Sequence, residues 1–260
     1  MRRAAAAAAA LAASILLASC GGGGGGGPAV KPPQGPPSAR HPASEIAAEL
    51  AGEQMRAHLL VAARLYNNGR FQFATDHMAA AEANYRTIAQ AVRTRDSVLD
   101  REFNAAFGVI AGQIAQRAQP LTVTNRMGIL QGQFLDAAIQ DSVSKPAFND
   151  PGVAALVMMR LANQAAREYA LSARVGNFTP RGKRAYQDAF GLLTRASSIS
   201  HRISPSLGPQ RNAIVNGITD AHGAGFLTGV LVPRHLHPAQ VAAGVRRAEQ
   251  GVLKRFGFTA

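Results

Sequence analysis

Helix start signals dominate the second half of this 260-residue chain and limit the folds that it can adopt. In Asp150-Pro151, and again in Thr179-Pro180, a residue that can cap a helix precedes a proline that fits the first helical turn. Gly176 supplies a stop signal between these two helices. No stretch of the chain convincingly alternates apolar and polar residues with the period of two that a half-buried strand requires. The sequence therefore predicts an all-α fold.

The same signals predict about eight helices over residues 44 to 260. We expect them at about residues 44–67, 71–92, 97–119, 125–143, 151–175, 180–203, 209–217 and 238–256. Short connections between consecutive helices favour antiparallel neighbours, so the predicted architecture is a bundle or a set of helical hairpins. The 217 residues of this region are enough for one large apolar core or two small ones.

One predicted hairpin, residues 59 to 85, has small and bulky residues in a familiar order. A glycine, an aromatic residue, a small residue, a bulky residue and an alanine follow one another at Gly69, Phe71, Ala74, Met78 and Ala81. In this the segment resembles a single tetratricopeptide unit. An array of such units needs about three copies of 34 residues, and we find no second copy, so an ordinary helical hairpin is the alternative.

The first 19 residues have the composition of a secretory signal peptide. Two arginines follow Met1, and an uncharged run of 14 residues extends from Ala4 to Leu17. This run is shorter and richer in alanine than a transmembrane helix, which needs about 20 strongly apolar residues.

The end of this segment, Leu17-Ala18-Ser19-Cys20, resembles the lipobox of bacterial lipoproteins. The resemblance implies cleavage before Cys20, a diacylglyceryl group on the Cys20 thiol and an acyl chain on the new amino group, with no other cofactor. Because Cys20 is the only cysteine, lipidation would leave no thiol for a disulfide. The alternative is an ordinary secreted protein that is cut near Ala18 or Ser19.

Residues 20 to 43 are predicted to form a linker. Seven consecutive glycines, Gly21 to Gly27, are followed by a proline-rich stretch with little to bury. A coil of this length spans roughly 25–30 Å, which would hold a folded body away from the bilayer. In lipoproteins of enteric bacteria, an aspartate after the lipidated cysteine often signals retention in the inner membrane. Gly21 stands at that position, so the resemblance favours the outer membrane, with the body facing the periplasm.

Charge divides the helical region into two halves. Residues 40 to 144 carry 10 basic and 10 acidic side chains, whereas residues 145 to 260 carry 15 basic and 5 acidic ones. Arg160, Arg167 and Arg174 recur every seven residues, which places them along one side of the predicted helix. Such a side could bind anionic lipid, lipopolysaccharide, the cell wall or an acidic protein partner. The alternative is a solvated face in an arginine-rich chain. The absence of tryptophan and the presence of only four tyrosines argue against nucleic acid.

Catalytic motifs are absent from the sequence. It contains no Gly-x-Ser-x-Gly, no His-Glu-x-x-His and no glycine-rich loop that ends in Gly-Lys-Ser or Gly-Lys-Thr. Glu45, Glu49 and Glu53 lie in the first predicted helix, where we attribute them to solvation and to the positive end of the helix dipole. No catalytic or cofactor-binding residue is predicted.

Two histidines between prolines are the best candidate for a metal site. His235 and His237 are two residues apart, so both imidazoles could reach one ion in an extended loop, with His222 or Asp220 as a third ligand. The alternative is a pair of exposed loop histidines. The sequence favours a lipid-anchored, non-catalytic envelope protein that binds or scaffolds at the interface of membrane and cell wall. The alternative function is a metal-dependent or cell-wall-acting enzyme with its site near His222 to His237.

Overall fold

The computed structural model describes residues 35–226 and 229–260, and helices are the only regular elements in them. The predicted all-α fold is therefore confirmed. The expected signal peptide, Cys20 and the glycine run lie outside the described residues. None of the described helices is long and apolar enough to cross a membrane.

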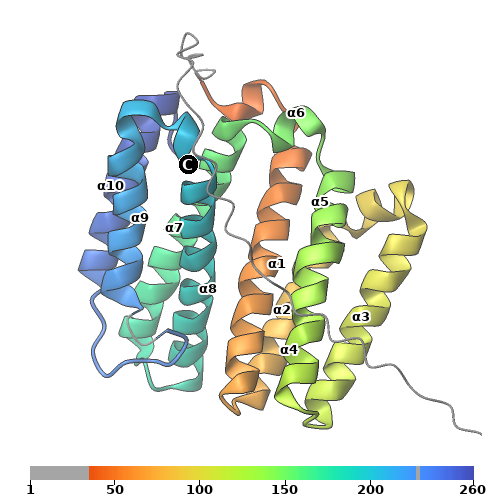
Figure 1. Cartoon of the computed structure of the whole chain (residues 1–260). Coiled ribbons are helices and arrows are strands. Elements are labelled where there is room, and N and C mark those ends of the chain that lie inside the picture. Colours follow the sequence, from red (N-terminus) through yellow and green to blue (C-terminus); the bar gives the residue numbers. More distant parts are fainter. Residues whose placement is uncertain (1–34, 227–228) are drawn as a thin grey trace, which may run out of the picture. The chain divides into compact units, whose positions relative to one another are not determined.

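Three antiparallel hairpins form the main body of the fold (Figure 1). In the described part, α1 (Ala43–Asn67) pairs with α2 (Phe71–Arg95), α7 (Pro151–Val175) with α8 (Pro180–Arg202), and α9 (Arg211–Gly225) with α10 (Pro238–Phe256). Helix α1 also packs along α8, while α9 packs on α8 and α10 on α7. One apolar cluster runs through all three hairpins.

The remaining helices cover the first hairpin. They are α3 (Ser97–Ala115), α4 (Pro120–Ile129), α5 (Leu135–Ser142) and the short α6 (Lys145–Phe148). A π-helical segment, η2 (Leu130–Phe134), joins α4 to α5 without a break, so the helix expected at residues 125–143 begins five residues earlier. Short 3₁₀ turns lie at η1 (Pro37–Ala39), η3 (Ser204–Ser206) and η4 (Gly208–Gln210).

The proline-marked starts are confirmed, but two predicted helix ends are wrong. Asp150 accepts a hydrogen bond from the amide of Gly152 at 2.7 Å, and Thr179 accepts one from Gly182 at 3.0 Å. Helix α3 ends at Ala115 rather than near residue 119, and Pro120 begins α4. Helix α9 does not end at Gly217 but continues to Gly225. Gly217 is not a stop, because its bare backbone packs against α10, where an added Cβ atom would lie 2.8 Å from the carbonyl oxygen of Gly244.

The last part of the expected linker packs on the bundle. The amide of Gly35 donates a hydrogen bond to the carbonyl of Phe256 at 2.9 Å. Arg40 and His41 both reach Asp150 Oδ2, at 3.0 and 2.9 Å, and thereby dock the chain at the start of α7. Residues 35 to 43, expected to belong to the linker, are therefore part of the folded body, because Arg40 and His41 contact the buried carboxylate of Asp150.

The segment that resembles a tetratricopeptide unit forms an ordinary helical hairpin. Ala74 and Ala81 are fully buried, and Met78 is nearly so, as a close approach of two helices requires. Helices α1 and α2, however, are 25 residues long each. Two such helices exceed the 34 residues that a complete repeat occupies.

Candidate functional site

Three titratable side chains from three helices meet inside the bundle: His58 on α1, His77 on α2 and Asp188 on α8. The Nδ1 atoms of the two histidines are 3.2 Å apart, and Asp188 Oδ1 lies 3.5 Å from each of them. His77 is fully buried, whereas the side chains of His58 and Asp188 are 14% and 20% exposed. Within the described ranges, this is the one group of three or more His, Cys, Asp or Glu residues whose ligand atoms could hold a metal ion.

The contact between α1 and α8 brings Asp188 to the histidines. At Gly191, three residues after Asp188, an added Cβ atom would lie 2.8 Å from the carbonyl oxygen of Ala57, the residue before His58. The absence of a side chain at Gly191 therefore lets the two backbones approach closely, since the side chains at a contact set the distance between helices. The pairing of α1 with α2 in one hairpin brings His58 and His77 together.

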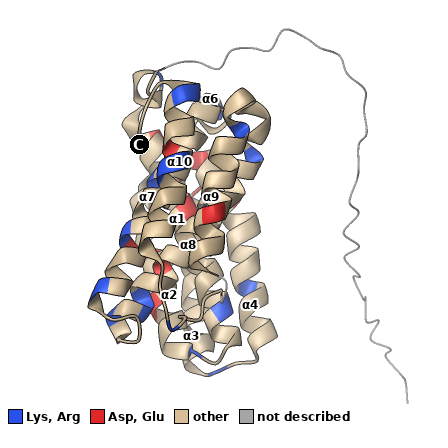
Figure 2. Ribbon diagram, turned by 90° about the vertical axis from the view of Figure 1, so that its left-hand side faces the viewer, with Lys and Arg blue, Asp and Glu red and all other residues tan. Residues whose placement is uncertain are grey.

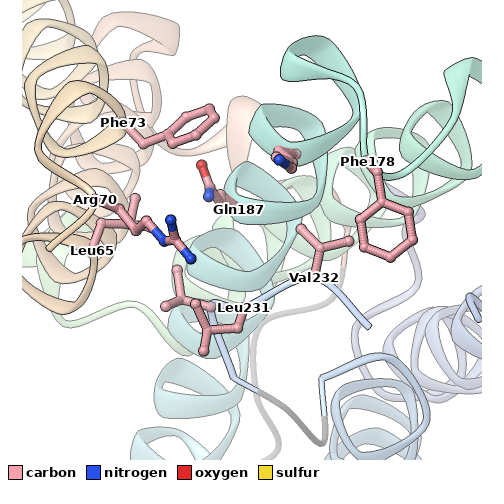
Figure 3. A pocket seen from close by; sticks show the side chains of 9 residues that line it. Leu65, Arg70, Phe73, Phe178, Gln187, Leu231 and Val232 are labelled. Atoms are coloured by element: carbon pink, nitrogen blue, oxygen red, sulfur yellow. The ribbon is translucent and has the colours of Figure 1, made fainter. Parts of the chain in front are cut away.

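Gln187 connects this cluster to a hollow on the surface. The Nε2–H of His77 donates a hydrogen bond to Gln187 Oε1 at 3.3 Å. Gln187 also lines a hollow of about 320 Å³ between α1, α2, α8 and the segment before α10. Figure 3 shows Gln187 in the middle of this hollow, with Phe73 and Arg70 on one side and Phe178 on the other.

Burial controls the protonation of the cluster. It lowers the pKa of His58 to about 3 and that of His77 to about 4, and the positive charge of Arg184 acts in the same direction. Burial also raises the pKa of Asp188 to about 7, against the effect of Arg184 and with the help of Glu168. At neutral pH both imidazoles are therefore uncharged, and the carboxyl group titrates near neutrality.

A second polar group lies further along the contact of α1 and α8, and it overturns one expectation. Glu49 and Glu53 are not solvated, since they are only 1% and 2% exposed. Arg195 pairs with Glu53 Oε2 at 2.8 Å, and Arg202 approaches Glu49 Oε1 at 3.4 Å. Arg56 on α1 adds a contact to Glu53 at 3.3 Å. The position of Glu49 and Glu53 in the predicted helix suggested solvation, but arginines of α8 contact both carboxylates instead.

The three arginines predicted to share one side of a helix do so. Arg160, Arg167 and Arg174 all lie on α7 and all are exposed. In the described part of the chain, none of the three forms an ion pair with a carboxylate. We call these three residues the α7 arginine row.

The predicted histidine group is only partly assembled. His235 and His237 are exposed and line one hollow beside Tyr169. His222 lies half-buried on α9, where its Nε2 is 3.1 Å from Thr194 Oγ1, and burial lowers its pKa. The three histidines do not form a group of metal-ligand atoms among the described residues.

The cluster of His58, His77 and Asp188 was not predicted, although the sequence indicates that the two histidines lie close together. His58 lies ten residues before Asn68 and His77 nine residues after it. The predicted hairpin, which turns at Asn68, therefore places the two histidines at about the same height on its two helices. Asp188 carried no comparable signal, because its place depends on the contact between α1 and α8.

Comparisons of this chain with protein-family models, with curated proteins and with solved structures gave no match.

Proposed function

We propose that this chain is a lipid-anchored protein of the bacterial cell envelope, whose helical body binds an anionic surface. The lipobox-like residues that end at Cys20, and the glycine run that follows, support an anchor and a tether. The helical body then lies on the periplasmic side of the outer membrane, where it has a binding or scaffolding role rather than a catalytic one.

The α7 arginine row is the observation that carries the binding role. Seven residues of helix correspond to a rise of about 10 Å, so the three guanidinium groups extend over about 21 Å of one side of α7. Within the described residues, none of them forms an ion pair with a carboxylate. Figure 2 shows basic segments along most of the height of the bundle, including both of its ends. A free row of this kind fits an extended anionic surface better than a single ion.

A shallow hollow beside this row favours phosphate as the anionic group. It has a volume of about 280 Å³, and its lining consists of Arg160, Asn163, Gln164 and Arg167 together with Leu50 and Ala260. Guanidinium groups bind phosphate oxygens with two parallel hydrogen bonds, and amide NH₂ groups can add further donors. The phosphate of an anionic lipid matches both this hollow and the length of the row.

Vesicle binding tests the proposal. The chain from residue 21 onward, produced without acyl groups, should bind vesicles that contain anionic lipid at low salt. It should dissociate near 0.5 M salt, where the Debye length is only about 4 Å. Each arginine near an anionic membrane contributes about 1 kcal/mol, so replacing the whole row by glutamine should weaken binding by on the order of 100-fold.

A matched variant controls for net charge. It removes the same number of exposed positive charges from the first half of the chain by Arg95→Gln, Arg101→Gln and Arg126→Gln. This control should bind almost as well as the parent chain, and both variants should keep their helical circular dichroism. Equal binding to neutral and anionic vesicles, or equal losses in the two variants, would refute a specific role for the α7 arginine row.

A further inference from the structure

We propose that His58, His77 and Asp188 bind a divalent transition-metal ion of the zinc type. The ligand atoms would be Nδ1 of His58, Nδ1 of His77 and Oδ1 of Asp188. This site is separate from the α7 arginine row, so the inference does not depend on the proposed binding of an anionic surface.

The distances between the three atoms fit a zinc site as they stand. Two ligands of a tetrahedral zinc ion lie about 3.3–3.4 Å apart, because each bond is about 2.0–2.1 Å long. The distances in the cluster are 3.2, 3.5 and 3.5 Å. A triangle with these edges has a point about 2.0–2.1 Å from all three corners, so an ion fits with little movement of the helices.

The surroundings orient the ligands in the way that metal sites require. A histidine ligand usually donates its other N–H to a fixed acceptor, which determines the tautomer. His77 does this, since its Nε2–H donates to Gln187 Oε1 and leaves the Nδ1 lone pair directed at the cluster. Asp188 Oδ1 is buried and makes no hydrogen bond in the described structure. An unpartnered buried carboxylate oxygen is costly, and a cation would compensate it.

Two charged side chains near the cluster have opposite effects on a bound cation. Arg184 is the cation whose charge reaches His58, His77 and Asp188, whereas Glu168 on α7 adds a negative charge near Asp188. Arg184 is exposed, so solvent screens much of its repulsion.

Three protein ligands leave a fourth tetrahedral position for water or another small ligand. Structural zinc sites usually have four protein ligands, whereas sites that exchange a ligand have three. The partial exposure of His58 and Asp188 gives an ion a route to the cluster from solvent. The competing explanation is a metal-free cluster, held by a hydrogen bond between the two imidazoles.

Zinc content and a cobalt spectrum separate these explanations. The experiment uses the full chain with Cys20→Ala, purified in detergent, because this change removes the only thiol that could bind metal. After incubation with Zn²⁺ and dialysis, we expect one equivalent of bound zinc and a raised melting temperature that a chelator reverses. Co²⁺ should give the intense visible absorption of a four-coordinate ion.

Variants assign the ligands. His77→Ala and the nearly isosteric Asp188→Asn should abolish the cobalt bands, and Gln187→Ala should weaken zinc binding by about 10–100-fold. Arg184→Gln should tighten it by relieving repulsion. His222→Ala is the matched control, because it changes a half-buried histidine outside the cluster, and it should bind zinc normally. Circular dichroism establishes that each variant is folded.

Two results would overturn the inference. One is a folded parent chain that retains no zinc and gives no four-coordinate cobalt spectrum. The other is loss of zinc in His222→Ala together with normal binding in Asp188→Asn, which would place the metal at the histidines first suggested by the sequence.

Discussion

Replacing Glu49 by glutamine should stabilise the fold at and above neutral pH. Glu49 is 1% exposed, and its Oε2 atom makes no hydrogen bond in the described structure. Burial raises the pKa of Glu49 to about 7, with Glu53 adding to the rise while Arg202 and Arg56 oppose it. Glutamine has nearly the same shape but no charge to desolvate, and Arg202 keeps contact with solvent because its side chain is 41% exposed.

The magnitude follows from the raised pKa. A change from 4.5 to about 7 means that the folded state binds this proton more tightly than the unfolded state does. Each pKa unit corresponds to about 1.4 kcal/mol, so the stabilisation by the bound proton amounts to roughly 3 kcal/mol. This stabilisation is complete below pH 4.5, where the unfolded state is also protonated. It is lost as the pH rises through about 7, because the buried carboxyl group must then ionise.

Urea denaturation at pH 5 and pH 8 measures the effect. The free energy of unfolding of Glu49→Gln should exceed that of the parent chain by less than about 1 kcal/mol at pH 5 and by roughly 3 kcal/mol at pH 8. Glu102→Gln is the control, because Glu102 is exposed and its replacement should change neither value. A difference between Glu49→Gln and the parent chain that is the same at both pH values would refute the reasoning, as would a less stable variant at pH 8.

Two further changes test the packing of α1 on α8 and the membrane anchor. Gly191→Ala should destabilise the fold by about 1–3 kcal/mol in the same urea assay, because the new carbon would lie 2.8 Å from the carbonyl oxygen of Ala57. Gly112→Ala, at an open position on α3, should not destabilise it, and equal effects of the two changes would contradict the close approach. Cys20→Ala should prevent lipid labelling and leave the precursor unprocessed by the lipoprotein signal peptidase. Normal cleavage and unchanged membrane fractionation of that variant would disprove the lipobox interpretation.

Local signals account for the parts of the fold that the sequence predicted well. Asp150 and Thr179 cap α7 and α8 through amides only two or three residues away. Such contacts can be inferred from neighbouring residues alone. The same local logic failed at Gly217, because glycine stops a helix in one context and permits close packing in another. Only the position of α10 distinguishes the two.

The functional side chains were harder to predict because their partners are distant in the chain. Glu45 lies in the first turn of α1, and Glu49 and Glu53 follow it at intervals of four residues, so the helix dipole and solvation were sufficient reasons for all three. The actual partners of the latter two, Arg195 and Arg202, lie more than 140 residues later. Because the helix dipole and solvation already explained Glu49 and Glu53, nothing in the sequence indicated that arginines of a distant helix bind them.

One structural feature, the contact between α1 and α8, explains why both polar groups lie where they do. The two helices run antiparallel, so the order Glu49, Glu53 and His58 along α1 faces the order Arg202, Arg195 and Asp188 along α8. Gly191 lies within this series, opposite Ala57. Close packing there removes water from every pair along the contact, which raises the cost of an unpaired charge. Arg195 meets that cost at Glu53, whereas Arg202 meets it only partly at Glu49, whose Oε2 atom makes no hydrogen bond in the described structure. At Asp188 two imidazoles lie 3.5 Å from Oδ1, which makes no hydrogen bond in the described structure, so the metal ion that we propose would be its partner there.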